Sequence, residues 1–261
     1  MNLKAALTAR LQSLRKYIPK VARSRSITRQ DGTAIGALLI AVLIFFRKVL
    51  FEDGYSIPWD FRSFHLPLAT ALLNALRSGE SLLWDPNTYC GRPLFGDPQV
   101  QLYYPPTDAV IALSALLPSL DVAYLLEWQL VLHVFAAGAF TFLFLRRAGI
   151  SSPAALCGGL IFELGGFFAS QAQHLGAIDS AVWIPLIWTG AWELRFGWKR
   201  LWFVVLAVAA AMCLLAGFTP TVITAFVSTV LMSSFLCCFR QGRWRQLMAI
   251  NLGPYGGRTF G

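Results

Sequence analysis

The sequence predicts an all-α, polytopic membrane protein with about six transmembrane helices and a large extracytoplasmic loop after the first helix. Hydrophobic residues make up 56% of the 261-residue chain, and charged residues make up only 13%. The mean hydropathy is +0.58, which is too apolar for a soluble domain of this size. Several apolar runs approach the ~20 residues that a helix needs to cross a bilayer.

Residues 1–32 are predicted to form a basic cytoplasmic segment, because they hold eight Lys and Arg but one acid, Asp31. Apolar residues recur there at helical spacing: Leu3, Leu7, Leu11, Leu14 and Ile18. This pattern predicts an amphipathic helix on the inner leaflet, and the alternative is a disordered basic tail. Basic residues also cluster at the ends of apolar runs, so membrane anchoring explains the net charge of +9 and no nucleic-acid partner is expected.

The transmembrane domain is expected to cover residues 33–261. The predicted spans are approximately residues 33–51, 122–145, 153–171, 180–196, 201–218 and 220–239. With a cytoplasmic N-terminus, these spans place every later basic cluster in the cytoplasm, as the positive-inside rule requires. The clusters are residues 146–147, 195–200 and 240–245. The apolar piece 109–117 is too short to span and would invert this pattern, so we predict an interfacial or re-entrant helix there.

Residues 52–121 are predicted to form one extracytoplasmic loop. Its acidic part, residues 52–108, carries seven carboxylates against three arginines. A loop of this length is more often functional than merely connective. Much of it is rich in proline and glycine, which predicts irregular backbone held by turns.

One stretch of the loop, residues 64–77, is predicted to be a helix on the outer membrane surface. Pro67 suits a first helical turn and Gly79 suits a helix end. Three leucines share one face and are expected to be buried: Leu68, Leu72 and Leu76.

The order of short motifs in the loop carries a resemblance to a known family. The motifs are, in order, Trp59-Asp60, Gly79-Glu80, Trp84-Asp85-Pro86, Gly91-Arg92-Pro93-Leu94, Asp97-Pro98-Gln99 and Tyr104-Pro105-Pro106. This order resembles the first extracytoplasmic loop of bacterial YfhO-type membrane proteins, which are similar to GT-C polyprenyl-phosphate-dependent glycosyltransferases. The likeness is strongest over residues 55–106, extends more weakly to Trp188, and covers the N-terminal half of such a protein.

The resemblance implies a fold like the N-terminal part of a GT-C fold, in the bacterial inner membrane. It also implies membrane lipid and a polyprenyl-phosphate sugar as partners. Asp60 matches the GT-C loop aspartate that acts as general base on an acceptor hydroxyl. A phosphate leaves without protonation, so one base is enough, but cations or a metal must stabilise the growing charge.

Two arginines and a second carboxylate are further candidates for this site. Arg62 and Arg92 are predicted to contact phosphate, because a guanidinium binds phosphate with two hydrogen bonds. Asp97 is the second catalytic candidate, which would hold a divalent cation or orient the acceptor. The alternatives are a helix cap or solvated charge for Asp60 and a turn residue for Asp97. Asp85 is predicted to be a turn former.

Four polar residues near or inside the predicted spans are further candidates for functional or structural roles. His174 lies in a short outer connection and faces the same compartment as Asp60, either as a substrate contact or as an interfacial histidine. Glu127, His133 and Glu163 lie inside predicted spans, where polar groups usually face the bundle interior. His133 and Glu163 lie at comparable depth, which allows a buried pair, and a structural hydrogen bond is favoured over the alternative of catalysis.

Two classes of function remain open from sequence alone. The first is a GT-C-type glycosyltransferase, or an inactive fragment of one, since such proteins have more spans and the chain is expected to be truncated at its C-terminus. The alternative is a non-enzymatic transporter or flippase, or a scaffold for envelope assembly. Irregular polar backbone is concentrated in one outer loop rather than at mid-membrane, which favours the enzyme. No metal-ligand spacing is present among the cysteines. The sequence identifies no cofactor, and the resemblance suggests a divalent cation.

Overall fold

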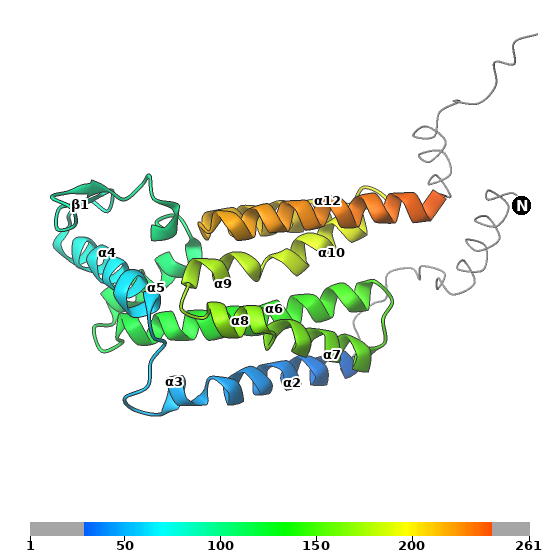
Figure 1. Ribbon diagram of the computed structural model, residues 1–261, viewed down its shortest axis with the longest axis horizontal. Coiled ribbons are helices and arrows are strands. Elements are labelled where there is room, and N and C mark those ends of the chain that lie inside the picture. Colours follow the sequence, from blue (N-terminus) through cyan, green and yellow to red (C-terminus); the bar gives the residue numbers. More distant parts are fainter. Residues whose placement is uncertain (1–28, 242–261) are drawn as a thin grey trace, which may run out of the picture.

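The computed structural model describes residues 29–241 as a bundle of helices with a smaller helical and hairpin layer at one end (Figure 1). Side chains are described for residues 31–235. The amphipathic helix predicted within residues 1–32 lies almost entirely outside the described residues, as does the basic cluster after residue 241.

The helices of the bundle fall where the apolar runs predicted them. The first run forms α2 (Arg29–Phe45) and α3 (Arg47–Phe51), and the second forms α6 (Val122–Arg147). The later helices are α7 (Ser152–Glu163), α8 (Gly166–Gln171), α9 (Leu175–Ala181), α10 (Ile184–Leu194), α11 (Arg200–Leu215) and α12 (Thr219–Gln241). The mainly helical class is therefore confirmed.

Length and composition qualify two helices as candidate membrane spans among the described residues. They are Val122–Arg147 and Ser152–Gln171. Three more apolar helices are shorter: Asp31–Phe45, Arg200–Leu215 and Thr219–Phe235. The number of six spans stays a prediction.

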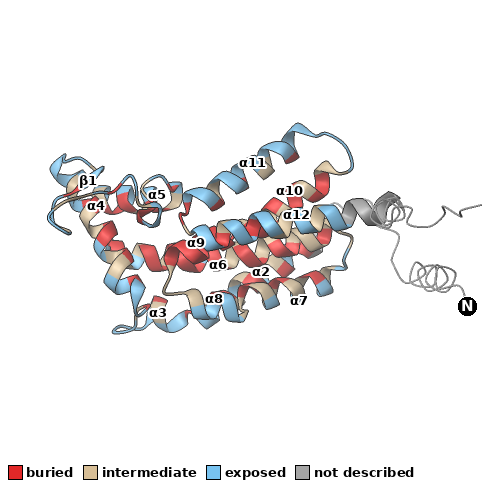
Figure 2. Ribbon diagram, turned by 45° about the horizontal axis from the view of Figure 1, so that its top comes forward, coloured by how far each residue is buried: buried red, intermediate tan, exposed pale blue. Residues whose placement is uncertain are grey.

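Helix α6 is the centre of the bundle. It packs against α2, α5, α7 and α10. Its buried face includes Leu126, Leu130 and Val134, each almost fully enclosed. With 26 residues it is ~39 Å long, longer than the ~30 Å hydrocarbon core of a bilayer. Figure 2 shows this contrast, with buried residues along α6 and α9 and a largely exposed α11.

The first predicted span is interrupted only at Phe46, between α2 and α3, and two later spans have longer breaks. Leu164 and Gly165 separate α7 from α8, and the extended backbone of Gly165 ends the helical path. Val182 and Trp183 separate α9 from α10, where Pro185 follows at the start of α10. Proline has no N–H to donate to the preceding turn, which accounts for this last break. The fourth span begins at Leu175, five residues earlier than the sequence predicted.

The predicted loop helix is present as α4 (Leu66–Ser78), preceded by a π-helical turn η1 (Phe61–His65). Gly79 ends it in the left-handed conformation (φ 69°). Leu68 and Leu72 are buried against the rest of the protein, because α4 packs on α5 (Pro105–Leu116) and α6. The apolar face of α4 is therefore covered by protein.

Leu76 is not covered by the protein, since it is 42% exposed, and its burial against the membrane surface stays a prediction. The last turn of α4 meets α5 through Arg77, whose Nη2 donates to the Ser114 carbonyl at 2.6 Å. This contact leaves Leu76 at the edge of the interface. The apolar piece predicted at residues 109–117 forms most of α5.

The proline-rich part of the loop is more regular than predicted. Strands β1 (Trp84–Asp85) and β2 (Arg92–Pro93) pair antiparallel, and a 3₁₀ turn η2 (Pro98–Val100) follows. Asp85 accepts hydrogen bonds from the Asn87 N–H (2.9 Å) and the Thr88 hydroxyl, so it is the predicted turn former.

Candidate functional site

Asp60 and His174 meet at the end of the bundle that carries α4 and the β1–β2 hairpin. Asp60 Oδ2 lies 3.2 Å from His174 Nδ1, and the two side chains are 53% and 32% exposed. Asp60 is fixed just before η1, and His174 is fixed just before α9. The sequence placed both residues in the same compartment, and the structure brings them into contact. An exposed carboxylate–imidazole pair can accept and hold a proton from a substrate hydroxyl.

His65 lies behind this pair and was not found from the sequence. Burial and the nearby His174 lower the pKa of His65 to about 4, although Asp60 and Asp97 act in the opposite direction. His65 is therefore neutral at neutral pH. One sequence signal could have revealed His65, because it lies on the same helical face as Leu68, three residues later.

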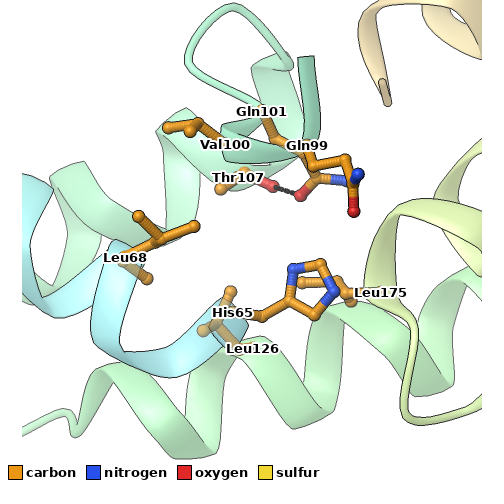
Figure 3. Close-up of a pocket in the computed structure, with 9 residues that line it drawn as sticks. His65, Leu68, Gln99, Val100, Gln101, Thr107, Leu126 and Leu175 are labelled. Atoms are coloured by element: carbon orange, nitrogen blue, oxygen red, sulfur yellow. Dashed lines mark hydrogen bonds between the residues drawn. The ribbon is translucent and has the colours of Figure 1, made fainter. Parts of the chain in front are cut away.

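A small pocket opens beside His65. It is lined by His65 and Leu68 on one side, by Gln99 and Gln101 on the other, and by Leu175 at the start of α9. In Figure 3 the imidazole of His65 faces the two glutamines across the pocket. It has room for about one water molecule. The pocket is therefore too small to hold a molecule much larger than water.

The predicted residues Arg92 and Asp97 bind each other. Arg92 Nη1 lies 3.1 Å from Asp97 Oδ2, while Asp97 Oδ1 accepts the Gln99 N–H at 3.0 Å and caps η2. This geometry agrees with the alternative reading of Asp97 as a turn residue. Arg62 is exposed on η1 and has no ion-pair partner in the described part of the chain. Within residues 29–241, no group of three or more His, Cys, Asp or Glu side chains is placed to hold a metal ion.

Below the pocket lies a network of buried polar side chains centred on Asp179 of α9. Asp179 is 0% exposed, and its Oδ2 accepts hydrogen bonds from Gln101 Nε2 (3.0 Å) and Gln129 Nε2 (2.8 Å). Gln101 Oε1 in turn accepts the Thr107 hydroxyl at 2.9 Å. Asp179 was not predicted as a site residue because the predicted fourth span begins at residue 180, which leaves Asp179 in the connection before it.

His133 completes the network. Its Nε2 lies 2.7 Å from the Tyr104 hydroxyl oxygen and 3.8 Å from Asp179 Oδ1, and its Nδ1 lies 2.7 Å from the Gln129 carbonyl. Trp183 Nε1 donates to the Tyr104 hydroxyl at 3.0 Å.

The expected pairing of His133 with Glu163 was therefore wrong. The Glu163 carboxylate packs against Gly138 of α6, where a Cβ would collide with it, and neither of its oxygens has a hydrogen-bond partner among the described residues. His133 faces the opposite way, towards Asp179. Glu127 has a different role, since its Oε1 accepts the Ile57 N–H at 3.1 Å and ties the start of the outer loop to α6.

Comparison with known proteins gives one family. The family model described as bacterial membrane protein YfhO matches residues 33–214. The match includes Asp60, His174 and the buried network around Asp179. No curated protein and no solved structure matches the chain.

Proposed function

The chain belongs to the YfhO family of bacterial membrane proteins, and from that premise we propose that it transfers a sugar from a polyprenyl phosphate at the outer face of the inner membrane. In this proposal the chain is a multi-pass protein with a cytoplasmic N-terminus, of GT-C type. The observation that carries it is the contact between Asp60 and His174 at 3.2 Å.

The geometry supports a base at the depth of the lipid headgroup. Asp60 follows Phe51, the last residue of α3, by nine residues, and this proposal places it near the water–lipid boundary. A polyprenyl phosphate places its phosphate at that depth and its chain in the bilayer. His174 Nδ1 lies 3.2 Å from Asp60 Oδ2, so the imidazole sits beside one carboxylate oxygen and Oδ1 remains to accept a proton.

The reaction needs one proton acceptor. Asp60 removes the proton of the acceptor hydroxyl, the resulting oxygen attacks the anomeric carbon, and the bond from that carbon to the phosphate oxygen breaks. The lipid phosphate leaves with the bonding electrons and needs no proton. Arg62 is the exposed cation closest to Asp60 in sequence and is available to offset the charge of that phosphate.

Purified chain in lipid nanodiscs would test the proposal, with a panel of radiolabelled undecaprenyl-phosphate sugars as donors and water as the acceptor hydroxyl. Asp60→Asn keeps the size of the side chain but removes its basicity, so sugar release should fall by ~10²-fold or more. Asp53→Asn, an exposed loop carboxylate, is the matched control and should leave release unchanged. Arg62→Ala should weaken binding of undecaprenyl phosphate itself. Equal sugar release by the parent protein and by Asp60→Asn would show that Asp60 is not the base.

A transporter or flippase remains the second candidate, because two helices of the bundle are discontinuous. The breaks between α7 and α8 and between α9 and α10 give irregular backbone away from the outer loop, a feature of many transporters. If no sugar is released, movement of a fluorescent polyprenyl phosphate across proteoliposomes that contain the chain is the experiment that favours this candidate.

A further inference from the structure

Asp179 is a buried carboxylate that lacks part of its hydrogen bonding. Its Oδ2 accepts two amide N–H groups, but its Oδ1 has no hydrogen-bond partner among the described residues. An isolated negative charge at this depth in a bundle is costly unless a positive charge or a proton offsets it. An ionisable side chain faces Oδ1, since His133 Nε2 lies 3.8 Å away.

The hydrogen bonds around His133 determine whether one of its two ring nitrogens carries a hydrogen. Nδ1 lies against the Gln129 carbonyl, which can only accept, so Nδ1 carries a hydrogen. Nε2 lies against the Tyr104 hydroxyl, which can donate or accept. The protonation state of His133 is therefore decided at Nε2.

Two arrangements satisfy the hydroxyl of Tyr104. In the first, it donates to a neutral His133, accepts from Trp183 Nε1, and leaves the negative charge of Asp179 without an opposite charge. In the second, His133 Nε2 carries an extra proton and donates to Tyr104, which donates in turn to the Asp179 carbonyl oxygen 3.4 Å away. The second arrangement keeps every one of these hydrogen bonds and places an imidazolium opposite the carboxylate, so it has the lower electrostatic cost.

We propose that Asp179, His133 and Tyr104 form a binding site for one proton, which is taken from the outer aqueous side and rests on His133 Nε2. Proton uptake converts a buried carboxylate and a neutral imidazole into a neutral ion pair, and the Tyr104 hydroxyl reverses its direction. Release returns the proton to water.

The path to the site is the small pocket described above. Gln101 and Thr107 line that pocket and also bind Asp179 and Gln129 in the network. Gln101 is held there in the left-handed conformation (φ 59°), which is unusual for a residue other than glycine. A water molecule in the pocket would lie between the outer surface and the amide that holds Asp179.

The other elements packed on α9 add little charge to the site. Helix α11 contributes the buried Cys213, which lies near Tyr104. Helix α8 has no ionisable side chain, and neither do the described side chains of α12. The site is thus governed by Asp179 and His133. It does not depend on sugar transfer, and a proton-coupled transporter would use a site of the same kind.

Nitrogen NMR tests the inference directly, because the chain has three histidines. The full chain is labelled with ¹⁵N-histidine in nanodiscs, and His65→Gln and His174→Gln assign the three imidazoles. At about pH 7.5 a free imidazole is mostly neutral, but His133 should be doubly protonated. In Asp179→Asn it should become neutral with the hydrogen on Nδ1, whereas Asp53→Asn should leave it charged. A neutral His133 in the parent, or a charged one in Asp179→Asn, overturns the proposal.

A second variant covers the case in which Asp179→Asn does not fold. In His133→Gln the imidazole is gone, so Asp179 should take the proton itself. Infrared difference spectra of chain labelled with ¹³C-aspartate should then show a new protonated carboxyl band that the parent lacks. Absence of this band in folded His133→Gln would also overturn the proposal.

Discussion

Asp31 at the start of α2 and Arg146 at the end of α6 form a buried ion pair with two contacts. Arg146 Nε lies 2.8 Å from Asp31 Oδ1, and Arg146 Nη2 donates to Asp31 Oδ2 at 3.2 Å. Arg146 Nη1 also donates to the Ile150 carbonyl at 2.8 Å. The pair joins the first and second long helices at the end of the bundle opposite to Asp60.

Arg146→Gln should destabilise the protein strongly, because it leaves Asp31 as a buried charge without its main partner. Removal of one member of a buried ion pair typically costs about 3–5 kcal/mol. Thermal unfolding in detergent, followed by size-exclusion chromatography, measures the effect. Arg62→Gln changes an exposed arginine and serves as control. Similar unfolding temperatures for the two variants would contradict this reading of the pair.

Leu72→Ala should destabilise the outer layer far more than Leu76→Ala does. Leu72 is 2% exposed in the core formed with α5 and α6, whereas Leu76 is 42% exposed on the same helix. Truncation of a fully buried leucine costs about 2–5 kcal/mol. Limited proteolysis of the outer loop, together with thermal unfolding, compares the two. Equal sensitivity would mean that α4 is not packed on the protein.

Acidification should weaken the fold through His65. Its folded pKa of about 4 lies below the ordinary value of 6.5, so the unfolded chain binds more protons between these two pH values. Stability is therefore complete above about pH 6.5 and falls as the pH drops towards 4, by up to roughly 3 kcal/mol. His65→Gln has no such proton to bind and should show a flatter dependence of unfolding temperature on pH. An unchanged slope in that variant would exclude His65 as the cause.

The native Cys90 offers a test of membrane topology. Cys90 is exposed in the loop that carries Asp60, while residue 151 follows the basic end of α6. In intact cells a membrane-impermeant maleimide should label Cys90 when the other cysteines are replaced. The same reagent should not label Ser151→Cys in a chain that also carries Cys90→Ser. Labelling of residue 151 from outside would show that the predicted orientation is wrong.

Gly190→Ala should separate α10 from α11. A Cβ at Gly190 would lie 2.8 Å from Leu206 Cβ and 3.1 Å from Leu206 Cα, so backbone as well as side chain would have to move. Gly166→Ala is the matched control, since nothing lies within 4 Å of its added Cβ. We expect a loss of about 1–3 kcal/mol for Gly190→Ala and little change for the control. Thermal unfolding distinguishes the two outcomes.

Local patterns were sufficient to predict the helices but not the contacts between them. Helix α4 was recognised because its apolar spacing, its proline and Gly79 all act within a few residues of the chain. The exposure of Leu76 depends on where α5 lies, and no local pattern carries that information. The β1–β2 pairing was missed for a related reason, since two-residue strands have no periodicity to detect.

The site was predicted in parts. The sequence predicts both Asp60 and His174 as site residues, but their contact joins segments far apart in sequence, so only the fold reveals it. The buried network was missed because Gln101, Thr107 and Gln129 are ordinary polar residues until Asp179 is placed beside them. The pairing predicted for His133 failed because similar depth in the membrane does not fix which side of a helix a residue occupies.

The turn between α11 and α12 is joined to the outer loop at two points. Gly217 (φ 81°) packs against the Pro98 carbonyl so closely that a Cβ there would collide with it, and Gln101 Nε2 donates to the Ala216 carbonyl at 3.1 Å. Because η2 sits on this turn, the loop and the last two helices are mechanically coupled. A molecule large enough to widen the pocket would have to push η2 outward and, with it, tilt α11 and α12 relative to α6.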